Sequence, residues 1–364
     1  MLKKLTIPIL TLLCLIVLDV MVAVVLSQAE ARGKLGALVT FFDYGRSVPG
    51  KLEKWEANPG ARGNLYETAW VPDILARSDA AFQEENPADG PVVRSYGMSF
   101  VNNIMRQAVD QEAALIWDGH SGPGGPPNFV FTLFEADRAN RRPGDVVVLG
   151  LLASGVPAMA ALSNRTWVFE QPAPFTYPIY WPEGETGLRA VEPLVTTAEA
   201  QRAIVPGSAE AAAWEAQLAE EDRFYGVQTF GLTALDASPF LRLVRRSVAK
   251  SYVEDAKADV LEDGAYPYGD VLRRMVLNFA AMAREDGQRP VVMLIQTRDP
   301  ADPGVFELVQ PVLDAENIPY LATVEHISPS DHTAFVGDGH YTKAVDGLFA
   351  ERLLEGALAG YRGQ

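Results

Sequence analysis

The stretch Asp145-Val146-Val147-Val148-Leu149-Gly150 decides the fold class of this 364-residue chain. A continuous apolar run of this length, bounded by an acid and a glycine, is typical of a strand buried on both faces of a parallel sheet. A second run of the same kind follows at Pro290 to Ile295. The two runs predict a sheet with helices on both of its faces.

Strand and helix patterns alternate around these two runs, which implies a parallel α/β sheet. The predicted elements, in chain order, are a strand at 91–96, a helix after Ser99, a strand at 113–117, a Gly/Pro loop at 119–127, a helix at 128–141, the strand at 145–150, a helix at 268–284, the strand at 290–295, a helix at 306–317 and a short strand at 319–322. We therefore divide the chain into an N-terminal segment (1–32), a wrapping segment (33–90) and an α/β domain (91–364).

The alternation breaks between about 164 and 263, and we expect an irregular, aromatic-rich insertion there. Aromatic side chains in such a loop are consistent with a lid or substrate wall, or with simple anchoring of a proline-rich loop onto the core. Both interpretations stay open from the sequence. The side chains concerned are Trp167, Phe169, Phe175, Tyr177, Tyr180 and Trp181.

Composition excludes some functions. The net charge of −16 would repel nucleic acid and anionic lipid headgroups, so we expect no nucleic-acid partner. The only cysteine, Cys14, lies in an apolar N-terminal run, and the four histidines have no metal-ligand spacing. The sequence therefore predicts neither a metal site nor a cofactor.

The run from Leu5 to Leu26 is nearly all apolar, apart from Asp19, and is long enough to cross a membrane as a helix. The basic pair Lys3 and Lys4 precedes it, which predicts a cytoplasmic N-terminus and a periplasmic or extracytoplasmic domain. The triplet Ala29-Glu30-Ala31 resembles a cleavage site, so a cleaved signal peptide is the alternative. The length of the apolar run favours an uncleaved single-pass anchor.

Near the C-terminus, Asp338 and His340 lie in a Gly-flanked turn, two residues apart. A carboxylate that orients an imidazole makes it a catalytic base, and such a base needs a nucleophile. Ser99 follows the first predicted strand, and this turn follows the last one. Because the carboxyl ends of parallel strands share one edge of a sheet, we expect Ser99, Asp338 and His340 to meet there.

These residues resemble those of the SGNH (GDSL-type) hydrolase family. Its Gly-Asp-Ser block is matched by Gly97-Met98-Ser99, and its C-terminal acid and histidine by Asp338 and His340. The resemblance covers about 91–358 and implies a flavodoxin-like, three-layer α/β/α sandwich with Ser99 as nucleophile, His340 as base and Asp338 as orienting acid.

The chain departs from the family at its Gly-x-Asn-Asp block, because Gly150-Leu151-Leu152-Ala153 has no asparagine. In the family that side chain donates a hydrogen bond to the oxyanion, and losing one such donor typically costs two to three orders of magnitude in rate. An active enzyme would need substitutes. The candidates are Asn128, Ser154 and the backbone of Gly124 or Gly125.

The resemblance and the expected membrane anchor together predict serine-dependent chemistry on an acyl ester. An acyl or acetyl esterase and an O-acetyltransferase are both consistent with the residues, and an acylated envelope or exported glycan is the expected substrate. The alternative is a non-catalytic, membrane-anchored glycan-binding or assembly protein with a degenerate SGNH fold.

Overall fold

The computed structural model describes residues 2–28, 33–35, 65–85, 91–168, 173–226, 238–262, 264–299 and 302–359. Its central element is a five-stranded sheet with the order β2-β1-β3-β6-β7, in which all neighbouring strands are parallel. The strands are β1 (Val93–Gly97), β2 (Trp117–Ser121), β3 (Val146–Leu152), β6 (Arg289–Ile295) and β7 (Tyr320–Ala322). β3 and most of β6 are buried along their length, as their apolar sequences predict.

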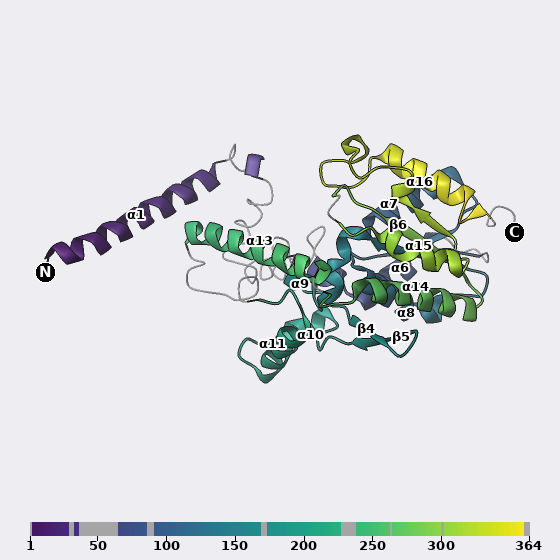
Figure 1. Ribbon diagram of the computed structural model, residues 1–364, viewed down its shortest axis with the longest axis horizontal. Coiled ribbons are helices and arrows are strands. Elements are labelled where there is room, and N and C mark those ends of the chain that lie inside the picture. The colour runs from purple at the N-terminus through teal and green to yellow at the C-terminus, as the bar shows by residue number, and fades with distance from the viewer. Residues whose placement is uncertain are drawn as a thin grey trace.

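Helices cover both faces of this sheet (Figure 1). On one side α7 and α16 pack together, α7 against β1 and β2 and α16 against β7. On the other side α8 contacts β1 and β3, and α14 contacts β6. The helices are α7 (Ser99–Gln111), α8 (Pro127–Ala136), α14 (Tyr268–Glu285), α15 (Val305–Ala315) and α16 (Lys343–Glu355).

One strand prediction was wrong. The strand expected at 113–117 begins at Trp117 and continues through Ser121, inside the stretch that we expected to be a loop. Its polar residues Asp118 and His120 are buried, because a network of charged groups surrounds them. The prediction was placed too early because residues 113–116 are all apolar, whereas the strand itself contains polar residues.

In the wrapping segment, α6 (Val71–Glu85) follows the short helix α5 (Leu65–Thr68) and packs against β2 and α8. Trp70 and Ile74 are buried in the main core. Ser78 donates a hydrogen bond to the backbone carbonyl of Gly119 at 3.1 Å, so α6 covers part of the exposed edge of β2.

The insertion contains a hairpin of β4 (Ile179–Glu183) and β5 (Gly187–Val191), with helices α9 (Asn164–Trp167), α10 (Ala198–Ala203), α11 (Ala209–Glu221) and α13 (Pro239–Glu262). The long helix α13 was not predicted. Phe175, Tyr177 and Tyr180 are buried in the core, and the Trp167 indole donates to the Tyr177 hydroxyl. These aromatic side chains therefore anchor the insertion, while Phe169 lies outside the described residues.

The N-terminal helix α1 (Leu2–Ser27) projects away from the α/β domain (Figure 1). Its segment Ile7–Ser27 is long and apolar enough to cross a membrane. Asp19, in the middle of this segment, accepts hydrogen bonds from the Ser238 hydroxyl at 2.5 Å and the Phe240 backbone N–H at 2.9 Å. Asp19 thus caps the first turn of α13.

Candidate active site

Ser99, His340 and Asp338 form a hydrogen-bonded chain at the carboxyl edge of the sheet. Ser99 Oγ lies 2.6 Å from His340 Nε2, and His340 Nδ1 lies 3.1 Å from Asp338 Oδ1. These distances let the imidazole accept the serine proton at one nitrogen while the carboxylate holds the proton at the other. Residues that are 241 positions apart in sequence therefore meet with the geometry of a nucleophile, a base and an orienting acid.

Ser99 is the first residue of α7 and follows β1 by one residue. The first backbone N–H groups of a helix have no partner within the helix and carry partial positive charge. Negative charge that develops beside Ser99 is therefore stabilised by the N-terminus of a 13-residue helix. This is the electrostatic environment that an acyl-transfer oxyanion needs.

Two glycines place α7 close to the sheet. A Cβ at Gly97 would lie 2.7 Å from Val101 Cγ2, and a Cβ at Gly150 would lie 2.3 Å from the same methyl group. Val101 of α7 therefore packs directly onto the backbone of β1 and β3. The glycine of the altered block at 150–153 has a packing role, and it sets the position of the helix that carries Ser99.

The turn that carries His340 is held by hydrogen bonds within the turn. Asp338 Oδ1 accepts from both the backbone N–H and the ring of His340, and these hydrogen bonds hold the pKa of Asp338 below its usual range. Gly339 has φ of +93°, a backbone conformation that residues with a side chain rarely adopt. The Val336 N–H donates to the His340 carbonyl, so the loop closes around the acid.

An open cleft of about 580 Å³ surrounds the three residues. Several of its other lining residues were missed by the sequence analysis: Asn103, Arg106, Gln107, Lys343 and Asp346. A signal for three of them was present, because positions 103, 106 and 107 follow Ser99 at the spacing of one helix face. Asn103 and Gln107 supply amide groups, while Arg106 and Lys343 supply positive charge.

Asp346 is a second carboxyl group in this cleft. It is 5% exposed, and its Oδ1 atom has no hydrogen-bond partner within the described residues. Burial raises the pKa of Asp346 to about 6, although the nearby His340 opposes this shift. An imidazolium formed at His340 therefore has a second acid close to it, besides Asp338.

The structure corrects one candidate oxyanion donor. The Asn128 side chain is buried and donates to the backbone carbonyls of Pro178, at 2.7 Å, and Met159, at 3.4 Å. Both amide hydrogens thus tie α8 to the turn that follows β3, at Met159, and to the insertion, at Pro178. Asn128 is a structural residue.

The other candidates lie in two adjacent loops at the carboxyl edge. Gly122 N–H donates to the carbonyl of Gly97 at 3.1 Å, which brings the loop of Gly124 and Gly125 beside the end of β1. Ser154 belongs to a 3₁₀ turn after β3, and the neighbouring Gly155 packs against this loop. Within the described part of the chain, none of these candidates lines the cleft around Ser99.

Of the remaining histidines, His120 lies inside β2 and is fully buried, while His326 and His332 belong to turns outside the group of Ser99, His340 and Asp338. Comparisons of the chain with models of protein families, with curated proteins and with solved structures found no match.

Proposed function

We propose that this protein is a serine-dependent acyl-ester enzyme, an acyl or acetyl esterase or an O-acetyltransferase. The observation that carries the proposal is the hydrogen-bonded chain from Ser99 through His340 to Asp338. The strand order of the sheet supports a flavodoxin-like, three-layer sandwich, in which ligands bind outside the carboxyl ends of the strands. Together with the sequence motifs, these features support membership of the SGNH hydrolases.

In the proposed mechanism, His340 Nε2 removes the Ser99 hydroxyl proton while Ser99 Oγ attacks the ester carbonyl carbon. The oxyanion is stabilised by the N-terminus of α7, including the backbone N–H of Ser99. The intermediate collapses, the ester C–O bond breaks, and His340 returns the proton to the leaving alcohol. A second nucleophile, activated by His340, then releases the acyl group from Ser99.

That second nucleophile decides the reaction. Water gives an esterase, and a sugar hydroxyl gives an O-acetyltransferase. The open cleft, with its amide groups at Asn103 and Gln107, supports a hydroxyl-rich substrate such as an acetylated glycan. The side chains of Arg106 and Lys343 also favour a substrate that carries negative charge.

The test is covalent labelling of the full chain, in detergent, with a fluorophosphonate probe. We expect labelling of the wild type and of Ser330→Ala, and none of Ser99→Ala or His340→Ala, provided that all four proteins have the same circular dichroism spectrum. Unlabelled wild type is then assayed with acetylated oligosaccharide for acetate release and for acetyl transfer, with the probe-labelled protein as the inactivated control. A folded wild type that resists labelling would overturn the enzyme proposal.

The second candidate is a non-catalytic glycan-binding or assembly protein. The absence of an asparagine from the block at 150–153 and the structural use of Asn128 favour it. Binding of glycan by Ser99→Ala and wild type with equal affinity, without labelling or turnover, would support this candidate.

For localisation we propose an uncleaved anchor, with a cytoplasmic N-terminus and the main domain outside the membrane. The capping of α13 by Asp19 supports it, because a cut after Ala31 would remove that cap. We expect the mature chain to begin at the initiator end and to stay in membranes washed at alkaline pH. An N-terminus found at Arg32 by sequencing would show a cleaved signal instead.

A further inference from the structure

A second group of chemistry-bearing residues lies within the fold, between β2, α6 and α8. His120 comes from β2, Asp79 from α6 and Asp137 from the end of α8, and all three ligand atoms lie within 4.8 Å of one another. His120 Nε2 is 3.7 Å from Asp79 Oδ1 and 3.9 Å from Asp137 Oδ2. We call these three residues the buried acidic cluster.

The imidazole of His120 distinguishes this cluster from an ordinary group of acids. The side chain has no solvent exposure, and neither ring nitrogen has a hydrogen-bond partner among the described residues. A buried polar group without a partner is unfavourable. Nε2 nevertheless lies within 3.9 Å of an oxygen of each of two carboxylates, Asp79 and Asp137, where a bound cation would give it a partner.

The carboxylates around His120 are held by their other contacts. Asn140 donates one amide hydrogen to Asp79 Oδ2 and one to Asp137 Oδ1, each at 2.9 Å. The Tyr96 hydroxyl donates to Asp137 Oδ2, and its ring stacks on the His120 ring. Asn140 therefore leaves Asp79 Oδ1 and Asp137 Oδ2 facing the imidazole, as expected for groups that orient metal ligands.

Charge in this region also favours a cation. Two more carboxylates lie nearby: Asp118 Oδ2 is 3.9 Å from His120 Nε2, and Asp145 is buried immediately before β3, two strands from β2. Arg94 pairs with Asp118 at 2.5 Å and with Asp145 at 3.3 Å. One guanidinium thus pairs with three acids, of which Asp137, at 3.9 Å, belongs to the cluster.

We propose that the buried acidic cluster binds one divalent transition-metal ion, Mn²⁺ or Zn²⁺, through Asp79 Oδ1, His120 Nε2 and Asp137 Oδ2. Bonds of about 2.0–2.2 Å place tetrahedral ligand atoms roughly 3.3–3.6 Å apart. The two distances from His120 Nε2, 3.7 and 3.9 Å, are close to this range, and the two carboxylate oxygens, within 4.8 Å of each other, would move closer together when the ion binds. An imidazole with carboxylates is a donor set that both ions accept. Water completes the coordination.

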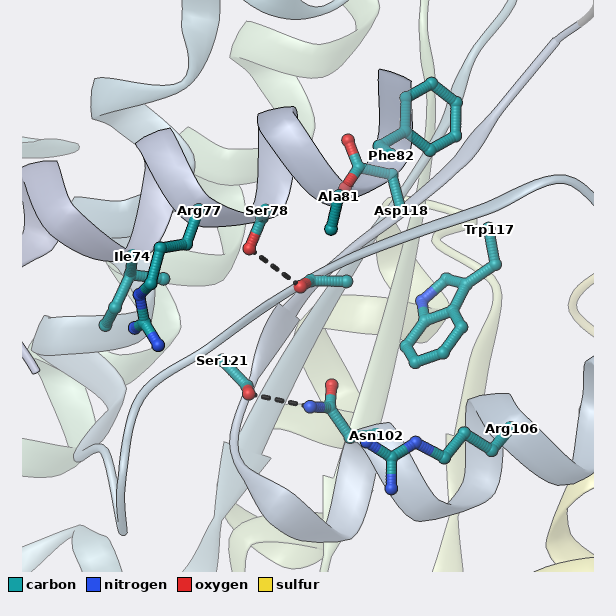
Figure 2. A pocket seen from close by; sticks show the side chains of 11 residues that line it. Ile74, Arg77, Ser78, Ala81, Phe82, Asn102, Arg106, Trp117, Asp118 and Ser121 are labelled. Carbon is teal, nitrogen blue, oxygen red and sulfur yellow. Dashed lines mark hydrogen bonds between the residues drawn. The ribbon is translucent and has the colours of Figure 1, made fainter. Parts of the chain in front are cut away.

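Access for the ion comes from the edge of the sheet. A pocket of about 270 Å³ lies between α6, α7 and β2, and Asp118, beside the cluster, lines it (Figure 2). Figure 2 also shows the bonds that frame the pocket, from Ser78 to Gly119 and from Asn102 to Ser121. Asp79 itself is 28% exposed, so its carboxylate is the ligand nearest to solvent.

The ion would fasten the wrapping segment to the core, since its ligands join α6 to β2 and α8. It lies apart from the cleft of Ser99, and none of the cluster residues lines that cleft. Its role is therefore structural, and the proposal stands or falls independently of the acyl-ester chemistry.

The test uses the full chain in detergent, stripped with a chelator and then titrated with Mn²⁺ by electron paramagnetic resonance and with Zn²⁺ by calorimetry. We expect one ion per chain and, at saturating ion, a rise in Tm of roughly 5 °C. Asp79→Asn, a near-isosteric change at the most exposed ligand, should weaken binding at least tenfold and abolish the Tm rise.

The matched control is Asp73→Asn, on the same helix but outside the cluster, which should bind as the wild type does. His120→Gln provides a second ligand variant, to be interpreted if its circular dichroism spectrum is native. The proposal is overturned if the wild type takes up no stoichiometric ion. It is equally overturned if Asp79→Asn binds both ions like the wild type, because the acidic surface of the chain would then account for the binding.

Discussion

The Phe100 ring stacks on the His340 ring, with centroids 4.6 Å apart and planes inclined by 26°. Phe100 follows the proposed nucleophile directly in sequence and is 8% exposed. Ser99 is thus the first residue of α7, and the second residue, Phe100, supports the imidazole that would activate Ser99. The position of the base is set by packing as well as by its hydrogen bonds.

We expect Phe100→Ala to lower the rate of fluorophosphonate labelling by about 10- to 100-fold, because small misplacements of a reacting group can cost this much. Phe100→Tyr keeps the ring and should retain more than half of the wild-type rate. Stopped-time gel fluorescence measures both rates. Equal rates in Phe100→Ala and wild type would show that the hydrogen bonds alone position His340.

Asp338→Asn should reduce labelling and any ester turnover by roughly 10²- to 10⁴-fold, since the imidazolium then loses the carboxylate that is hydrogen-bonded to its Nδ1 atom. The change is nearly isosteric on a side chain that is 71% exposed, so Tm should remain within about 2 °C of the wild type. If Asp338→Asn retains full activity, the orienting role belongs to Asp346 instead. The Asp346→Asn variant should then be labelled more slowly than Asp338→Asn.

Asp346 predicts a pH effect on stability. Its pKa in the folded chain is about 6, whereas the ordinary value is 3.8, so ionisation is disfavoured in the folded state. Stability from this group is therefore complete below pH 4 and is lost as the pH rises through 6. At pH 7.5 we expect Asp346→Asn to be more stable than wild type by about 1–2 kcal/mol, after allowance for solvent screening.

Urea unfolding of wild type and Asp346→Asn at pH 4.5 and pH 7.5 measures this effect. The difference between the two proteins should shrink at the lower pH. A difference that stays constant with pH would mean that the Asp346 carboxyl group titrates normally.

Gly150→Ala tests the contact between the sheet and α7. The new methyl group would overlap Val101, and overpacking of this kind costs typically about 1–3 kcal/mol. Because the strain falls on the helix that carries Ser99, labelling should slow by at least tenfold in protein that is still folded. Double substitution with Val101→Ala should restore part of the rate.

Gly347→Ala is the control for Gly150→Ala. Its methyl group would meet only Gln111 Nε2, at 3.8 Å, and an alanine in the interior of α16 should stabilise the chain by roughly 0.5–1 kcal/mol. If Gly150→Ala behaved like this control, the packing role of Gly150 would be refuted.

The sequence predicted the sheet where apolar runs are long, as at β3 and β6. It failed at β2, because burial there depends on partners from distant elements, such as Arg94 and Asp79, which no local pattern reveals. It also missed α13, whose mixed apolar and basic residues give no clear stripe, and whose first turn is capped from α1.

The same distinction applies to the site. Ser99, Asp338 and His340 follow strands of the predicted sheet, so the strand pattern alone predicts that they meet at its carboxyl edge. In the structure, His340 lies within hydrogen-bond distance of both Ser99 and Asp338. The prediction of Asn128 as an oxyanion donor rests on its position in the sequence alone. It is wrong because the Asn128 amide donates to the carbonyls of Met159 and Pro178, in segments whose paths the sequence does not predict. Asp346 was missed because a carboxyl group one turn into a helix usually faces solvent.

The hydrogen bonds that Asp19 accepts from the first turn of α13 fix the position of α13 along the length of α1. At 1.5 Å per residue, Asp19 lies roughly 12 Å along α1 from Ser27. For a chain held in a membrane by α1, the start of α13 would therefore lie at the depth of Asp19, below the membrane surface, and the domain would sit against the bilayer. Under the proposed function, the protein would act only on substrate that lies close to the lipid surface.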